Sequence, residues 1–192
     1  WIDTMQAMMP ELSIHAEMGM SDRLTRFLVE GVIQAALLYT PQLRPGLRVE
    51  PVLEEELILV ASFETDVKDL GKEYVAVDWG PEFTHMHASA LPHLTNSGRS
   101  LALGGLAADY IVNRRAAAYL PARAVQRYLD VGKLHVVANS PRFAYPAWVV
   151  WREDLDPEML SIARRSLMDL AQAAENQQNI LIESLDNGQK TP

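Results

Sequence analysis

The stretch Ala116–Leu134 (AAAYLPARAVQRYLDVGKL) indicates the fold of this chain better than any other segment. Its short apolar run ends at Pro121, which has no N–H for a sheet ladder and a φ suited to the first turn of a helix. From Ala124 on, apolar residues recur at the spacing of an amphipathic helix. Gly132 ends that helix, and Leu134–Ala138 (LHVVA) predicts the next strand. The segment therefore predicts a strand–helix–strand unit of an α/β protein, in which ligands gather where strands end.

The composition limits the classes of protein to which the chain can belong. Its 192 residues suffice for one ordinary domain or two small lobes around a cleft. With 48% hydrophobic and 22% charged residues, the chain resembles soluble globular proteins, and no apolar run is long enough to cross a membrane. Zero cysteines exclude disulfides and thiolate metal sites. The net charge of −8 argues against nucleic-acid binding by this chain, because phosphate neutralisation dominates such binding.

The rest of the chain continues the alternation of strands and helices. The predicted strands are Leu12–Met18, Val32–Tyr39, Leu57–Ser62 and Tyr74–Trp79. The second of these is apolar throughout, which predicts a parallel strand buried on both faces. The predicted helices are one that ends before Pro10, then Ser21–Glu30 with Ser21 or Asp22 as its cap, His85–Leu91, Ser100–Val112 and Pro157–Gln177. The polar tail from Asn187 predicts disorder.

The order of several motifs resembles that of the effector-binding domain of LysR-type transcriptional regulators. The matching pieces, in chain order, are Val29-Glu30-Gly31 before the apolar strand, Glu54-Glu55-Glu56 before LILVAS (Leu57–Ser62), Leu120-Pro121, Gly132-Lys133-Leu134 and Pro146–Trp151. The resemblance implies an α/β fold of two βα lobes joined by two crossing hinge strands, as in type 2 periplasmic binding proteins. It implies lobe I at residues 1–61 and 150–192 and lobe II at residues 62–149. Because the chain opens inside a helix, we expect the first strand to be missing and the DNA-binding winged helix-turn-helix to be absent from this chain.

The same resemblance implies a function. We expect the small-molecule effector-sensing domain of a bacterial, cytoplasmic regulator, without enzyme activity or a cofactor, that shifts the arrangement of an oligomer when the effector binds. It implies a homodimer that uses the helix Ser21–Glu30, and a tetramer in the full-length protein, with DNA bound only through the absent domain. The alternative is a solute-binding protein of a transport system, which shares the two-lobed fold.

Candidate effector contacts fall at the ends of predicted strands. Trp79, Gly80 and Phe83 match an effector-contacting loop of the family, and Gly80 lets the backbone approach a ligand closely; the same loop would also suit a turn that packs two aromatic rings in the core. Thr40 and Met20-Ser21 match strand-end positions that contact effectors in the family. Thr40 would also suit a turn before Pro41, and Ser21 a helix cap; neither role excludes contact with a ligand.

Arg99 is flanked by Ser97 and Ser100, where a helix is predicted to begin. A guanidinium in the cleft beside unpaired helix N–H groups would bind a carboxylate or phosphate, which predicts an anionic effector. The alternative is a solvated arginine on a loop. One departure from the family pattern is nearby, because Val112–Arg115 (VNRR) stands where the family often has Ala-Gly-Leu-Gly.

The sequence offers little for metal binding or catalysis. His85 and His87 are two residues apart on a predicted helix, so their side chains point to different sides and cannot chelate one ion simply. There is no HExxH, GxSxG, SxxK or P-loop pattern. We therefore expect neither a metal site nor a catalytic centre.

Overall fold

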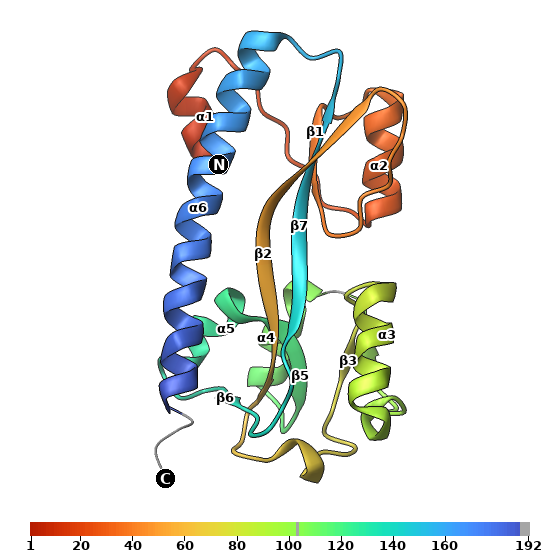
Figure 1. Cartoon of the computed structure of the whole chain (residues 1–192), viewed down its shortest axis with the longest axis vertical. Coiled ribbons are helices and arrows are strands. Elements are labelled where there is room, and N and C mark those ends of the chain that lie inside the picture. The colour runs from red at the N-terminus through yellow and green to blue at the C-terminus, as the bar shows by residue number, and fades with distance from the viewer. Residues whose placement is uncertain (103, 189–192) are drawn as a thin grey trace. The chain divides into compact units, whose positions relative to one another are not determined.

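The computed structural model describes residues 1–102 and 104–188 (Figure 1). The chain forms two compact units. Unit 1 comprises Trp1–Glu54 and Pro146–Asn176, and unit 2 comprises Glu55–Tyr145 and the chain from Gln177 on. Among the described residues, none of the helices combines the length and the apolar character that a membrane crossing requires.

Unit 1 is built on antiparallel strands. Its elements are α1 (Ile2–Met8), α2 (Ser21–Glu30), β1 (Ala35–Leu38), the first part of β2 (Leu47–Ala61), the second part of β7 (Phe143–Arg152) and the first part of α6 (Pro157–Gly188). β1 pairs antiparallel with β7, with Leu37 opposite Val149. The helices lie on both sides of these strands: Val150 packs with Leu24 of α2, whereas Val149 packs with Met5 of α1 and with α6 (Figure 1). Alternation along β7 thus gives unit 1 two apolar layers.

Unit 2 combines parallel strands with helices. Its elements are the end of β2, the 3₁₀ turns η1 (Val67–Asp69) and η2 (Pro92–Leu94), β3 (Ala76–Val77), α3 (Pro81–Ala90), β4 (Ser100–Leu101), α4 (Gly104–Val112), β5 (Ala117–Pro121), α5 (Ala122–Leu129), β6 (His135–Val136), the start of β7 and the end of α6. β3 pairs parallel with β4, and a parallel bridge joins Tyr74 to Ala117 at the start of β5. β5 and β6 both pair antiparallel with β2, so they run in the same direction.

The strand–helix–strand unit predicted from Ala116–Leu134 is confirmed as β5–α5–β6. Pro121 ends the strand and precedes the helix with φ −58°. Gly132 adopts φ +66°, and its N–H donates to the carbonyl of Leu129. This left-handed residue ends the helix as expected and turns the chain into β6.

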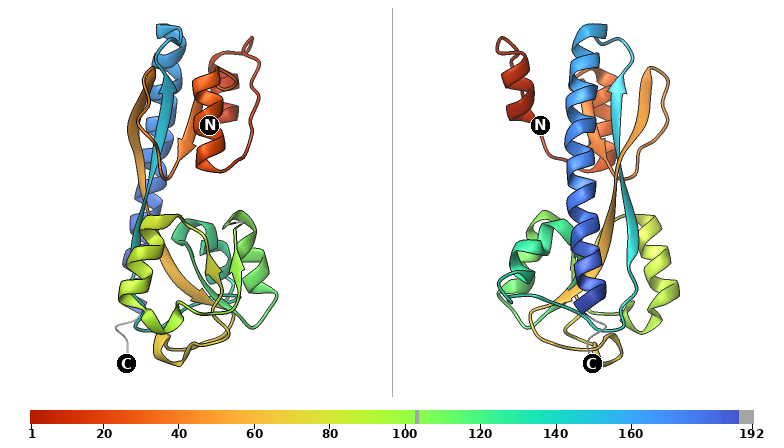
Figure 2. Two further views of the ribbon diagram at one scale, coloured as in Figure 1. Left: turned by 90° about the vertical axis from the view of Figure 1, so that its right-hand side faces the viewer. Right: turned by 60° about the vertical axis from the view of Figure 1, so that its left-hand side comes forward.

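Two faces of β5 explain how the helices of unit 2 are arranged. Ala118 and Leu120 pack in an apolar cluster with α4, α5 and the end of α6. Tyr119 points to the other face, where its ring meets Phe83 of α3. Accordingly, α3 and α5 lie on opposite sides of these strands (Figures 1 and 2).

Two predicted strands differ from the structure. Leu12–Met18 forms no strand, because the described structure pairs no strand with it; its Met18 side chain is 94% exposed. The predicted parallel strand Val32–Tyr39 is the short antiparallel β1, and because Leu37 is 48% exposed, the strand is not fully buried on both faces. The strand starts late because the N–H of Val32 still donates to Phe27 at the end of α2.

The last helix is longer than predicted. α6 runs from Pro157 to Gly188 and so includes Asn187, at which disorder was expected to begin. Buried Gln178 and Leu181 explain the extension, since both lie in unit 2 beyond the predicted end at Gln177. The tail at 189–192 lies outside the described residues.

Candidate functional site

The loop between β3 and α3 has a fixed backbone. Gly80 adopts φ +97° and ψ 172°, a conformation that other residues avoid. Its N–H donates to Oδ1 of Asp78 at 3.0 Å, and Pro81 follows as the first residue of α3. Only Asp78, Trp79 and Gly80 therefore connect the end of the strand to the start of the helix.

Trp79 presents a ring rather than a donor. Its Nε1–H donates to the carbonyl of Tyr119 at 2.8 Å, and its ring meets Tyr145 edge to face with centroids 5.4 Å apart. Because the donor is satisfied by β5, the half-buried indole can offer a ligand only its apolar surface.

Phe83 lies one turn into α3 and is 5% exposed. Its ring packs against Tyr119 at 5.6 Å and Phe143 at 5.4 Å between centroids. The structure thus places Phe83 in an aromatic core cluster behind the loop, where it supports α3. Effector contact by Phe83 stays a prediction.

His87 joins this cluster, a role that sequence reasoning missed because it considered His87 only as a metal ligand. Its ring stacks on Tyr74 with centroids 5.2 Å apart and planes 8° apart, and its buried Nε2 has no hydrogen-bond partner among the described residues. Burial, with a smaller contribution from the charge of His93, lowers the pKa of His87. Its position one helical turn after Phe83 was the available signal.

Arg99 does not lie at a helix start, so that prediction is wrong. Ser100 and Leu101 form β4, opposite Ala76 and Val77 of β3, and α4 begins only at Gly104. The backbone of this segment pairs with β3, since the carbonyl of Arg99 accepts the N–H of Ala76.

The side chains of Arg99 and Ser97 make hydrogen bonds within the turn that precedes β4. The guanidinium of Arg99 donates to the carbonyl of Lys72, and Ser97 Oγ donates to the carbonyl of Arg99 at 3.0 Å. Ser100 is exposed on β4. Arg99 precedes β4 whereas Trp79 follows the parallel β3, so the two lie at opposite ends of this strand pair. The structure therefore does not bring Arg99 and Trp79 together.

The carboxyl ends of β3, β4 and β5 share one edge, because the three strands run parallel. A helix begins within a few residues of each end: α3 at Pro81, α4 at Gly104 and α5 at Ala122. Helix starts carry unpaired N–H groups and a partial positive charge, so this edge can bind an anionic group. Gly104 itself lies against the ring of Trp79. Sequence reasoning missed Gly104, since the predicted helix covered it.

In unit 1, the predicted residues lie around the start of α2. Met20 is the residue that precedes α2 and is 62% exposed, and Ser21 is the first helical residue. Neither Ser21 nor Asp22 caps the helix, because the cap position is occupied by Met20, whose side chain makes no capping hydrogen bond. Thr40 follows β1, and Gln42 just beyond it donates to Asp22 at 3.2 Å. Ser21 and Thr40 thus belong to neighbouring segments of one unit.

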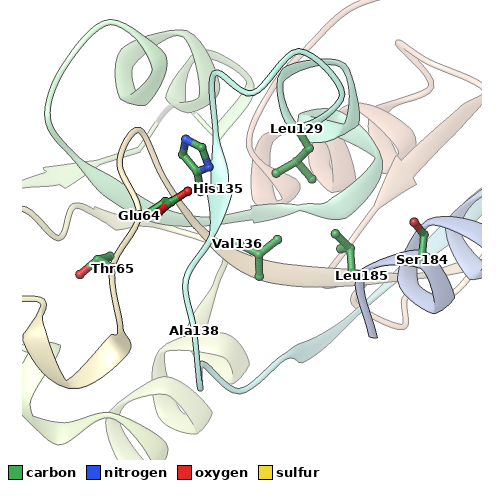
Figure 3. A pocket seen from close by; sticks show the side chains of 8 residues that line it. All are labelled: Glu64, Thr65, Leu129, His135, Val136, Ala138, Ser184 and Leu185. Carbon is green, nitrogen blue, oxygen red and sulfur yellow. The ribbon is translucent and has the colours of Figure 1, made fainter. Parts of the chain in front are cut away.

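A cavity of about 450 Å³ in unit 2 contains none of the predicted site residues. Leu129, Val136 and Leu185 supply apolar lining, and Glu64 lies beside His135 (Figure 3). Its apolar residues also pack against the unit 2 core. Among residues 1–102 and 104–188, no group of three or more histidine, aspartate or glutamate side chains is placed to hold a metal ion.

Comparison with known proteins gives the class of protein to which this fold belongs. The family model described as the LysR substrate binding domain matches residues 1–172. The chain belongs to this family, the effector-binding regulatory domain of LysR-type transcription regulators, and has its two-lobed, periplasmic-binding-protein-like fold. The alternative of a transport solute-binding protein is not favoured. No sequence among the curated proteins matches the chain.

Solved structures show the same fold at low sequence identity. The bromide-bound regulatory domain of HypT from Salmonella typhimurium is 15% identical, with a TM-score of 0.72 over 90% of this chain and 89% of that one. Reduced OxyR from N. meningitidis is 17% identical, with a TM-score of 0.66 over 88% and 85%. Full-length LysG from Corynebacterium glutamicum is 11% identical, with a TM-score of 0.67 over 89% of this chain but 62% of LysG.

Proposed function

We propose that this effector-sensing domain binds a small anionic molecule and thereby controls the DNA binding of a larger LysR-type regulator. The family match over residues 1–172 is the observation that carries the sensing role. DNA binding by a separate N-terminal domain, assembly into dimers and tetramers, a cytoplasmic location and the lack of enzyme activity are parts of the same proposal, taken from the family. An effector with different affinities for two arrangements of the oligomer would change their ratio.

The anionic character of the effector is supported by the carboxyl edge of unit 2. The first turns of α3, α4 and α5 begin along this edge, and their unpaired N–H groups favour negative charge. Two relatives bind ligands that fit such a site: HypT binds bromide, and LysG binds arginine, which carries a carboxylate. The indole of Trp79 would cover the apolar part of the effector.

We propose Trp79 and Gly80 as effector contacts in unit 2, and Met20, Ser21 and Thr40 in unit 1. Four further contacts stay predictions, by Ser97, Arg99, Ser100 and Phe83. The hydrogen bonds of the Arg99 turn and the burial of Phe83 argue against them.

A ligand screen with matched variants tests the proposal. Carboxylates, sulfonates and phosphates are screened by thermal shift on the full-length protein, and hits are titrated against Trp79→Ala and Arg99→Ala. We expect Trp79→Ala to weaken binding about tenfold or more, since it removes the aromatic wall, and Arg99→Ala to change it less than about twofold. A screen in which none of these anions binds would contradict an anionic effector.

DNA binding provides the second readout. In a gel-shift titration of the full-length protein on its own promoter, the hit should change the affinity or the number of shifted complexes. Trp79→Ala should need a correspondingly higher ligand concentration for the same change. A ligand that binds without any effect on the protein–DNA complexes would show that the domain does not control them.

A further inference from the structure

A second cavity, of about 350 Å³, lies in unit 2 between the end of β2 and the loop that joins α4 to β5. It is lined by Ser62, Phe63, Val112, Asn113, Arg114 and Arg115. This loop contains the VNRR segment in which the chain departs from the family pattern. The cavity lies at the amino end of β5, whereas Trp79 lies at the carboxyl edge of the parallel strands. It is therefore separate from the proposed effector contacts.

Two guanidinium groups are held in place at this cavity. Arg114 stacks over the ring of Tyr110 at 4.2 Å, and Arg115 stacks over the ring of Phe63 at 3.8 Å. Arg114 Nη1 also donates to the carbonyl of Tyr110 at 3.4 Å. Stacking uses the face of a guanidinium, so the other N–H groups at its edge can donate to a ligand. The loop backbone is also fixed, because Ser62 Oγ donates to the carbonyl of Arg114 and accepts the N–H of Ala116.

Neither arginine has a carboxylate partner within the described ranges 1–102 and 104–188. Elsewhere in the chain, arginines that pair with carboxylates include Arg123, Arg142, Arg152 and Arg164. Two cations that line one small cavity repel each other, and a bound oxyanion would reverse that repulsion. Guanidinium groups bind carboxylates and phosphates through paired N–H donors.

We propose that this cavity is a second anion site, which binds a small molecule carrying a phosphate or carboxylate group. The volume lies near the lower end of the range of small-molecule sites, roughly 300–1,000 Å³. Phe63 and Val112 supply apolar surface for the carbon part of such a ligand. Six lining residues make a patch smaller than a stable protein interface, which buries about 800 Å² on each partner. The net charge of −8 disfavours DNA as the occupant.

Calorimetric titration of the full-length protein tests this site. The probes are inorganic phosphate, pyrophosphate, glucose 6-phosphate and succinate, at constant ionic strength. The variants are Arg114→Gln, Arg115→Gln and the double variant. Arg165→Gln on α6 is the matched control, since it removes the same charge from an exposed arginine in unit 1. Because all three positions are exposed, the variants should keep the melting temperature of the parent.

We expect at least one probe to bind with a dissociation constant of about 1 mM or tighter, and each single variant to weaken it about tenfold. Arg115→Lys should restore only part of the affinity, because lysine keeps the charge but not the planar fork. Arg99→Gln and Trp79→Ala should leave this binding unchanged, which separates it from effector binding.

Three outcomes would overturn the proposal. One is no heat of binding for any probe at about 10 mM, a range in which even weak sites are occupied. Another is an equal loss in Arg165→Gln and in the cavity variants, which would show a general charge effect. The third is duplex DNA that binds through Arg114 and Arg115 while the small anions do not, which would assign the pair to DNA.

Discussion

Gly104, the first residue of α4, lies directly against the indole ring of Trp79. A Cβ built on Gly104 would lie 2.5 Å from both Cη2 and Cζ3 of that ring, closer than nonbonded carbon atoms approach. The ring cannot move away freely, because its Nε1–H is bonded to the carbonyl of Tyr119 and its edge meets Tyr145. Glycine at position 104 thus lets α4 begin beside the proposed effector wall.

Gly104→Ala should therefore destabilise the protein and displace Trp79. We expect a net loss of about 1–2 kcal/mol in the free energy of unfolding, since the clash exceeds what alanine adds to helix propensity. Urea unfolding gives the stability, and the difference in tryptophan fluorescence between the variant and the parent reports the displacement of the Trp79 ring. Gly71→Ala is the control, because a Cβ there meets nothing within 4 Å, and it should change stability by less than about 0.5 kcal/mol. Equal effects of the two variants would show that Trp79 does not need glycine beside it.

A second prediction concerns Glu55, a carboxylate in β2 that is only 6% exposed. Arg123 of α5 donates to it from Nε at 3.0 Å. Arg123→Ala removes this guanidinium and should cost about 2 kcal/mol, because a buried carboxylate loses its cation. The control is Arg164→Ala. The Arg164 side chain pairs with Glu50 but is 55% exposed, so this substitution should cost less than about 1 kcal/mol. Chemical denaturation measures both, and a smaller loss for Arg123→Ala would argue that α5 is held by apolar packing alone.

Local signals explain which parts of the structure the sequence could predict. Pro121 and Gly132 restrict their own backbones, so β5–α5–β6 followed from local chemistry alone. Leu12–Met18 has the alternation of a strand, but a strand also needs a hydrogen-bonding neighbour, which no local pattern reveals.

The candidate site depended on contacts between distant residues. Arg99 was placed at a helix start because the polar cluster around it looks like a cap, yet pairing with β3 makes the segment a strand. His87 meets Tyr74, Tyr119 and Phe143 only after the chain folds, so its burial had no signal beyond its position on α3.

The buried His87 predicts a pH dependence of stability. Its pKa in the folded protein is lowered from an ordinary value of about 6.5, so below that pH the unfolded chain binds a proton that the folded chain resists. Stability is therefore full above about pH 6.5 and falls as the pH drops toward the lowered pKa. In His87→Phe this part of the pH dependence should vanish.

Urea titrations between about pH 8 and pH 5 measure the effect, in a range above the titration of ordinary carboxyls. His85→Gln is the control, because His85 is exposed on the same helix and should leave the pH dependence as in the parent. A parent protein whose stability stays level across this range would mean that His87 is protonated as easily when folded as when unfolded.

Hydrogen exchange with and without the tightest-binding anion of the screen tests the central claim most directly. The N–H groups at the starts of α2, α3, α4 and α5 have no helical partner and exchange fast in the free protein. If the carboxyl edge binds the anion, exchange should slow at Glu82 and Phe83, at residues 104–106 and at residues 122–124 of unit 2, and at the start of α2 around Ser21. Slowing confined to the Arg99 turn at residues 97–101, or to the second anion site around Arg114 and Arg115, would contradict the proposed effector site.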